Sequence, residues 1–222
     1  MSQPLNLFGA ALLVALLAVP AFAQTAAAVP LRADGAGMVL TAEGHHVLMP
    51  LPDWLDANGI AGGDVVPLVD ATFAQSPGQA TLDIIAKGDT AANWKVRYGA
   101  RLLLSTTGTL ADFRQLIMAR YAKNCQPRTV GFFQLGPDTA EALAPLGFVC
   151  GAYFDGLVGL AGQGEVAVIQ LLRTNDGYGA IYQDWRGAAF DPSDPKSWPV
   201  ATSIVQARAF QLQGAARLSL AD

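Results

Sequence analysis

Side chains that carry catalysis or charge are scarce in this chain of 222 residues. It has two histidines and two cysteines, and charged residues make up 14% of it, below the roughly one quarter that is usual. No run of Lys or Arg occurs, and the formal net charge is −4. Because an acidic chain is repelled by a phosphate backbone and by an anionic bilayer, we expect no nucleic-acid partner and no electrostatic membrane binding.

Motifs of the common enzyme classes are also missing. The chain has no G-x-S-x-G turn, and no serine is paired with a histidine by spacing. His45 and His46 are adjacent, so on a strand they point to opposite faces and would not share a metal ion. We therefore expect no catalytic residues, no metal and no cofactor, and a binding protein is favoured over an enzyme.

The first 23 residues contain no charged side chain. Residues 5–19 are almost wholly apolar, and Ala21-Phe22-Ala23 follows Pro20, which is typical of a signal peptide (residues 1–23) cut after Ala23. An uncleaved anchor is the alternative, although the apolar run is shorter than the roughly 20 residues that span a bilayer. We expect a periplasmic or secreted protein that meets a membrane only if the signal stays uncleaved.

The two cysteines, Cys125 and Cys150, are too far apart in sequence for a C-x-x-C redox motif. In an oxidising compartment a lone pair of cysteines usually bonds, so we expect one intramolecular disulfide. Closing a loop of this length stabilises the fold by roughly 3 kcal/mol.

Residues 24–35 are rich in alanine and include Pro30 and Gly35, which predicts a flexible lead-in. The length of the remaining chain predicts a single domain over residues 36–222. We expect strands at residues 38–40, 46–49, 80–86, 96–105, 129–135, 148–154, 165–173 and 178–185, and helices at 110–123, 137–144 and 203–212. Short turns between strands, with helices in separate runs, indicate an α+β domain with an antiparallel sheet and helices packed on it.

Two local signals are sharper than the rest. Asn175-Asp176-Gly177 between alternating strands predicts a hairpin, with Gly177 at a positive φ. Thr109 is a candidate N-cap for the helix that begins near Leu110, and Asp112 favours its first turn.

Aromatic and polar side chains gather in two stretches, and such a face can hold a ligand. The candidate binding residues are Asn93, Trp94, Tyr98, Tyr182, Trp185 and Arg186. Strand alternation places Tyr182 and Asp184 on one face and Trp185 on the other, so at most half of the set shares a surface. The alternative is core packing, and we expect Trp94 and Trp185 to be mainly core residues.

The segment Lys87-Gly88-Asp89-Thr90-Ala-Ala-Asn93-Trp94 resembles the K/P-G-E/D-T-x-x-N-W signature of a group of uncharacterised secreted proteobacterial proteins. Its later counterpart is the glycine-rich turn and strand from Gly177 to Arg186, so the resemblance covers residues 87–186. It implies a helix and a cysteine pair between the motifs, which Cys125 and Cys150 would match. It also implies a sheet-and-helix sandwich similar to the PsbP-type fold, and it offers no activity.

Two classes of function stay open. One is an exported, non-enzymatic protein that binds a periplasmic protein or a small molecule. The alternative is a hydrolase with a site assembled from residues distant in sequence. A well-formed polar pocket would favour the hydrolase, and an exposed apolar patch would favour the binding protein.

Overall fold

The computed structural model describes residues 28–35, 37–55, 60, 63–138 and 143–221. The proposed signal peptide and the middle of the helix predicted at 137–144 lie outside the described residues. The described chain is 44% strand and 17% helix, and its strands form two antiparallel sheets. The α+β class with antiparallel strands is therefore confirmed, with two sheets where one was expected.

The larger sheet has seven strands in the order β4-β5-β6-β10-β9-β8-β7. Their bounds are β4 (Val69–Ser76), β5 (Gln79–Ala86), β6 (Val96–Leu104), β7 (Val130–Gln134), β8 (Leu146–Cys150), β9 (Gln163–Arg173) and β10 (Gly177–Ala188). The smaller sheet has the order β1-β2-β3-β11. Its strands are β1 (Leu31–Asp34), β2 (Gly37–Ala42), β3 (His45–Pro50) and β11 (Arg217–Leu220). The helices are α1 (Leu110–Ala122), α2 (Thr202–Ala215) and the short 3-10 helix η3 (Val66–Leu68).

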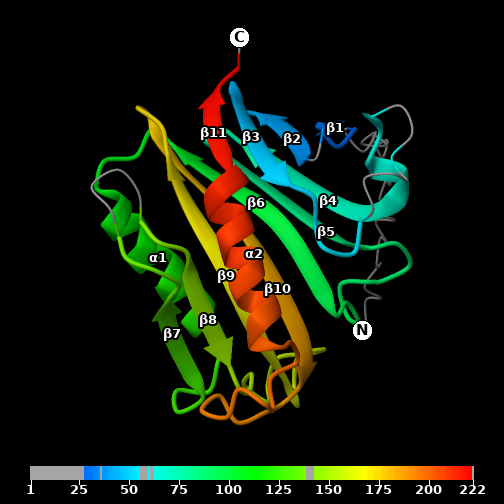
Figure 1. Cartoon of the computed structure of the whole chain (residues 1–222), viewed down its shortest axis with the longest axis vertical. Coiled ribbons are helices and arrows are strands. Elements are labelled where there is room, and N and C mark those ends of the chain that lie inside the picture. The colour runs from blue at the N-terminus through cyan, green and yellow to red at the C-terminus, as the bar shows by residue number, and fades with distance from the viewer. Residues whose placement is uncertain (1–27, 36, 56–59, 61–62, 139–142, 222) are drawn as a thin grey trace, which may run out of the picture.

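The two α-helices cover opposite faces of the larger sheet, as the alternation along β9 shows. Val166 and Val168 belong to the apolar cluster that includes the buried face of α2. Ile169 and Leu171 belong to the cluster that includes Phe113 of α1. Figure 1 shows α2 across the front of the sheet, with the smaller sheet at its upper end. We call these two sides the α2 face and the α1 face.

Four segments differ from the sequence-based expectation. Residues 31–34, expected within a flexible lead-in, form β1 and pair with β2. Strand β4 was missed because most of its side chains are partly or fully exposed, which hides the apolar alternation. Strand β11 was missed because it has four residues and none is buried. Strand β8 begins at Leu146 and ends at Cys150, earlier than the strand expected at 148–154.

The hairpin at Asn175-Asp176-Gly177 is confirmed, since β9 and β10 pair directly on either side of it. The expected positive φ at Gly177 is wrong, because Gly177 is not among the residues in that region. A Cβ at Gly177 would lie 2.5 Å from the Leu103 carbonyl oxygen and 2.7 Å from the Leu104 Cα. Glycine is needed here for close approach to β6 and not for backbone conformation.

Both ends of α1 are held. The Thr109 side chain accepts a hydrogen bond from the Asp112 N–H at 3.1 Å, and Asp112 Oδ2 accepts one from the Thr109 N–H at 2.7 Å. This reciprocal capping box confirms Thr109 as the N-cap. Beyond the other end, a disulfide joins Cys125 to Cys150 at the end of β8, as expected. The C-terminal turn of α1 is thereby tied to the sheet.

No helix among the described residues is long and apolar enough to cross a membrane.

Candidate functional site

A cavity of about 590 Å³ opens on the α1 face, beside the C-terminal turn of α1. Its walls come from β6, β9, β10, α1 and the loops at residues 91–94 and 153–160. Its lining is rich in positive charge and carries one carboxylate, Glu165. The cationic lining residues are Arg97, Arg101, Arg120, Lys123 and Arg186. These are five of the fourteen Lys and Arg residues of the chain.

Strand register brings the polar residues of the cavity together. Arg97 on β6 is opposite Asp184 on β10, and Arg186 on β10 is opposite Glu165 on β9. Residues two apart on a strand share a face, so Arg101 lies on the same side as Arg97. Side chains that are up to 89 residues apart in sequence are therefore neighbours across three strands.

At the base of the cavity, Arg97 forms an ion pair with the buried carboxylate of Asp184. Arg97 Nε donates to Asp184 Oδ2 at 2.7 Å, and the Tyr121 hydroxyl donates to Asp184 Oδ1 at 3.1 Å. Asp184 is fully buried. Burial raises the pKa of Asp184, although the Arg97 guanidinium opposes that rise. Burial alone would lower the pKa of Arg97, yet the carboxylates of Asp184 and Glu165 raise it overall.

Glu165 is the second buried carboxyl of the site. Only 4% of it is exposed, and the Tyr153 hydroxyl donates a hydrogen bond to its Oε2. Burial, followed by the nearby charge of Asp184, raises the pKa of Glu165 to about 7. The carboxyl therefore changes charge within the physiological range.

Trp94 forms a wall of the cavity between two guanidinium groups. Arg186 lies 4.0 Å from the centre of its ring, and Arg97 lies 4.7 Å from it. Arg186 is held in place by two backbone carbonyls, since its Nε donates to Trp94 O at 3.1 Å and its Nη2 to Ala92 O at 3.0 Å. Its buried Nη1 has no hydrogen-bond partner among the described residues. The hydrogen-bonding capacity of this guanidinium is thus only partly used by the described residues.

The outer rim carries three cations that no carboxylate neutralises. Within the described part of the chain, Arg101, Arg120 and Lys123 make no salt bridge. Burial and then the positive charge of Arg101 lower the pKa of Arg120. Two guanidinium groups that repel each other in this way would be stabilised by an anion placed between them.

Gly99 allows Tyr182 to lie flat against β6. The Tyr182 hydroxyl donates to Asp83 Oδ1 at 2.6 Å and approaches Leu82 O at 3.1 Å. A Cβ at Gly99 would lie 2.2 Å from Leu82 O and 2.6 Å from the Tyr182 hydroxyl. Any larger residue at position 99 would displace this ring from the floor beside the cavity.

The structure divides the six candidate binding residues between two faces. Trp94 and Arg186 line the cavity, and Tyr182 lies next to it over Arg97 and Arg101. Trp185 is 5% exposed and packs in the α2-face cluster, together with the fully buried Tyr98. The Tyr98 hydroxyl donates to Pro50 O. Asn93 is exposed and accepts a hydrogen bond from the Thr90 N–H within its own turn.

No protein-family model matches the chain, and no curated protein matches it. The resemblance to the secreted proteobacterial group, and with it the PsbP-type fold, therefore stays a prediction.

Sequence reasoning missed most of the cavity. Arg97, Arg101, Arg120, Tyr121, Tyr153, Glu165 and Asp184 were not among the candidate site residues. One signal was present in the sequence: Glu165 and Asp184 lie inside predicted strands whose other residues are largely apolar. Charged residues inside such buried strands are rare unless they are paired, and here they mark the site.

The histidines do not contribute to this cavity. His45 Nε2 lies 3.1 Å from Asp176 Oδ1, and His46 Nδ1 lies 3.0 Å from Thr41 Oγ1. Among the described residues no group of three or more His, Cys, Asp or Glu side chains is placed to hold a metal ion.

Proposed function

We propose that the protein is an exported, non-enzymatic binding protein whose ligand is a small organic anion held in the cavity beside α1. The observation that carries this proposal is the gathering of five of fourteen cationic side chains around one cavity in a chain of net charge −4. Guanidinium groups are the preferred partners of carboxylate and phosphate oxygens, because they offer paired donors in a fixed plane.

Export is part of the same proposal and is supported by the disulfide between Cys125 and Cys150. Disulfides form and persist in the periplasm and outside the cell, and are rare in the cytosol. The apolar segment at residues 5–19 supports it independently.

The second candidate function is hydrolysis, and two observations favour it. The cavity is polar, and Glu165 has a pKa of about 7, which suits a general acid or base. Against it, Tyr153 already donates to the Glu165 carboxyl, and the described residues that line the cavity include no Ser, Thr, Cys or His. Turnover of an ester, phosphoester or glycoside panel that is lost in Glu165→Gln would favour this second function.

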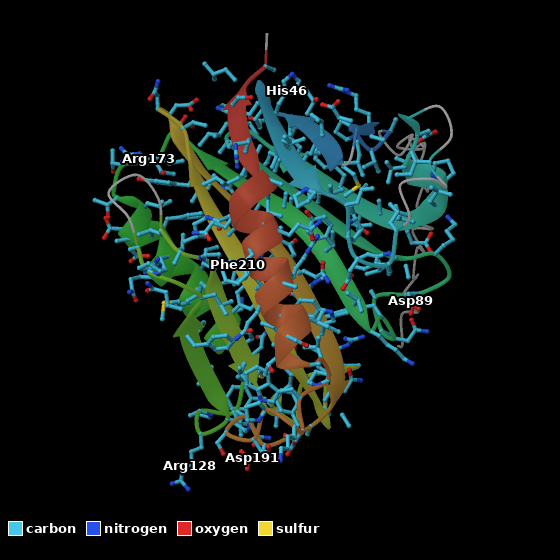
Figure 2. All side chains as sticks on the ribbon, in the orientation of Figure 1. His46, Asp89, Arg128, Arg173, Asp191 and Phe210 are labelled. Carbon is cyan, nitrogen blue, oxygen red and sulfur yellow. A yellow bond between two sulfur atoms is a disulfide. The ribbon has the colours of Figure 1, made fainter. Side chains whose placement is uncertain are left out.

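Isothermal titration with small di- and tricarboxylates and with phosphate monoesters tests the binding proposal. The double variant Arg120→Gln, Lys123→Gln removes two exposed rim cations, and we expect it to weaken binding at least about tenfold. The matched control is Arg128→Gln, Arg173→Gln, which changes the net charge equally. Arg128 and Arg173 are exposed, and they lie at the lower end and the upper left of Figure 2, outside the cavity lining.

Equal loss of affinity in both double variants would mean that overall charge, and not this cavity, attracts the anion. If no member of the panel binds, the proposed function is wrong.

A further inference from the structure

A second cavity, of about 550 Å³, continues from the first along the α1 face. It lies between α1 and strands β5 and β6. The two cavities share three lining residues, Arg101, Arg120 and Lys123. The three rim cations therefore lie at the junction of the two cavities and line both of them.

The second cavity differs from the first in its chemistry. Its far end is apolar, with walls formed by Leu103 of β6 and by Phe113, Leu116 and Ile117 of α1. Leu103 follows Arg101 by two residues on the same strand, so the apolar wall begins directly beside the cations. The cavity is thus a trough with an apolar wall from α1 and Leu103, the polar residues Gln79 and Thr81 on β5, and positive charge at one end.

Leu116 is the most exposed part of this wall. Its neighbours on α1, Phe113 and Ile117, are buried against the sheet. Leu116 is 54% exposed and faces the trough, where no described element covers it. Burial of such a side chain under a ligand would be favourable, because apolar area removed from water stabilises the complex.

We propose that the two cavities together bind a single-chain anionic amphiphile. Its carboxylate or phosphate head contacts Arg101, Arg120 and Lys123, and its alkyl chain lies in the trough against Leu103 and Leu116. The positive charge of the shared rim residues places the anionic head at the junction of the two cavities. The apolar wall that begins beside these residues places the alkyl chain of the ligand in the second cavity. This inference rests on the proposed anion-binding function and names the class of its ligand.

The volume and polarity of the site agree with this occupant. Each cavity, of about 590 and 550 Å³, separately lies within the roughly 300–1,000 Å³ that is typical of a ligand site, and the second supplies the apolar wall. Each buried methylene is expected to tighten binding roughly fourfold. Affinity should therefore rise with chain length until the trough is full.

The test is titration of the purified protein with two homologous series, alkyl phosphates and alkyl carboxylates, from four to twelve carbons. We expect affinity to increase roughly fourfold per methylene over the shorter members. Comparison of the two series at equal chain length shows which head group the cations prefer. Arg120→Gln, Lys123→Gln should weaken binding at every length.

Leu116→Gln separates the chain site from the head site. This variant should flatten the dependence on chain length, so that it weakens binding of dodecyl phosphate more than binding of butyl phosphate. The matched control is Leu220→Gln on β11, where Leu220 is 64% exposed and lies outside both cavities. The control should keep the full chain-length dependence. Thermal unfolding of each variant shows that it is folded.

A second measurement locates the chain directly. A decyl phosphate that carries a photoreactive diazirine at its tail should label the peptide containing Leu103 or the peptide containing residues 113–117. Labelling confined to other peptides would overturn the inference.

The remaining outcomes also decide the matter. Equal affinity for butyl phosphate and dodecyl phosphate would overturn the amphiphile inference and would leave the proposed anion site intact. Chain-length dependence that persists in Leu116→Gln would place the chain elsewhere. Binding to phosphatidylglycerol vesicles without binding to the free amphiphiles would replace the single-chain ligand by a bilayer. Failure of every anion, short or long, would remove the proposed function as well.

Discussion

On β9 and β10, residues that are adjacent in sequence meet two different environments. Trp185 and Val166 point to the α2 face, which is covered by a helix and by the smaller sheet. Glu165, Asp184 and Arg186 point to the α1 face, where two cavities remain. The same strands therefore build a closed apolar layer on one side and, on the other side, an apolar layer under α1 with a charged site beside it.

Two buried arginines sharpen the comparison. On the α2 face, Arg208 lies 4.5 Å from the Tyr98 ring and donates to Leu51 O at 2.7 Å. On the α1 face, Arg186 lies over Trp94 and donates to two backbone carbonyls. Both keep unpartnered nitrogens among the described residues. Only Arg186 lines a described cavity, so access, and not burial, distinguishes a binding group from a structural one.

The largest expected effect is on the α2 face. Trp185→Ala should lower the free energy of unfolding by about 3–5 kcal/mol, because it opens a cavity in a closed apolar layer. Trp94→Ala should cost about 2 kcal/mol, since Trp94 belongs to none of the apolar clusters of the described residues and two guanidinium groups lie over its ring. Urea denaturation of both variants measures the difference. An equal cost would show that the α1 face is packed as tightly as the α2 face.

The disulfide makes the next largest expected contribution to the free energy of unfolding. It joins two segments that both lie on the α1 side of the larger sheet. Replacing both Cys125 and Cys150 by Ala should lower the free energy of unfolding by about 3 kcal/mol. Because the bond ties the end of α1 to β8, hydrogen exchange should rise first around residues 118–125. Reduced parent protein is the control and should match the variant. Uniform exchange across both faces would contradict a local role.

The close contact between Gly99 and Tyr182 on the α1 face has a smaller expected effect on stability. Gly99→Ala should cost about 1–3 kcal/mol, because its Cβ would overlap Leu82 O and the Tyr182 hydroxyl. Gly131→Ala on β7 is the matched control, since a Cβ there meets nothing within 4 Å. Thermal unfolding of the two variants measures the difference in their stability. Equal stability of both would mean that Tyr182 does not need its place over β6.

The smallest effect is the pH dependence contributed by Glu165. Burial raises its pKa to about 7 in the folded state, above its value of 4.5 in the unfolded chain. The folded state thus binds more protons between these values, so stability is full below about pH 4.5 and falls as pH rises through 7. We expect the free energy of unfolding to be at least about 1 kcal/mol lower at pH 7.5 than at pH 5.5.

Glu165→Gln tests this directly, because the amide keeps a hydrogen-bond acceptor for Tyr153 and cannot ionise in this range. Its stability should be flatter between pH 5.5 and 7.5 than that of the parent. Chemical denaturation at the two pH values measures it. An opposite slope in the parent, with stability rising across this range, would show that the carboxyl is ionised in the fold.

Sequence reasoning worked best for local features. The helix at residues 110–122 and its Thr109 cap, the hairpin after β9 and the Cys125–Cys150 bond all depend on nearby residues or on a single possible pairing. It failed for β4 and β11, whose exposed side chains leave no apolar alternation to read.

The candidate site was harder to predict. Trp94 and Arg186 were found because aromatic and polar residues cluster in sequence around them. Arg101 and Arg120 were not found, because each is an ordinary surface cation when read along the chain. They become candidate binding residues only because the fold places them on opposite walls of one trough.

The sequence by itself determined which residues alternate along each strand, where α1 begins and which cysteines pair, because these follow from local geometry and composition. Tertiary structure alone decided how each face of the larger sheet is covered. The smaller sheet and α2 pack against one face, and α1 covers the other only in part, so that two cavities remain beside it. Strands β2 and β3 of the smaller sheet precede β9 and β10 by more than a hundred residues, so their packing cannot be read from local sequence. The cations gather around the two cavities, since charge is tolerated where water or a ligand can reach it.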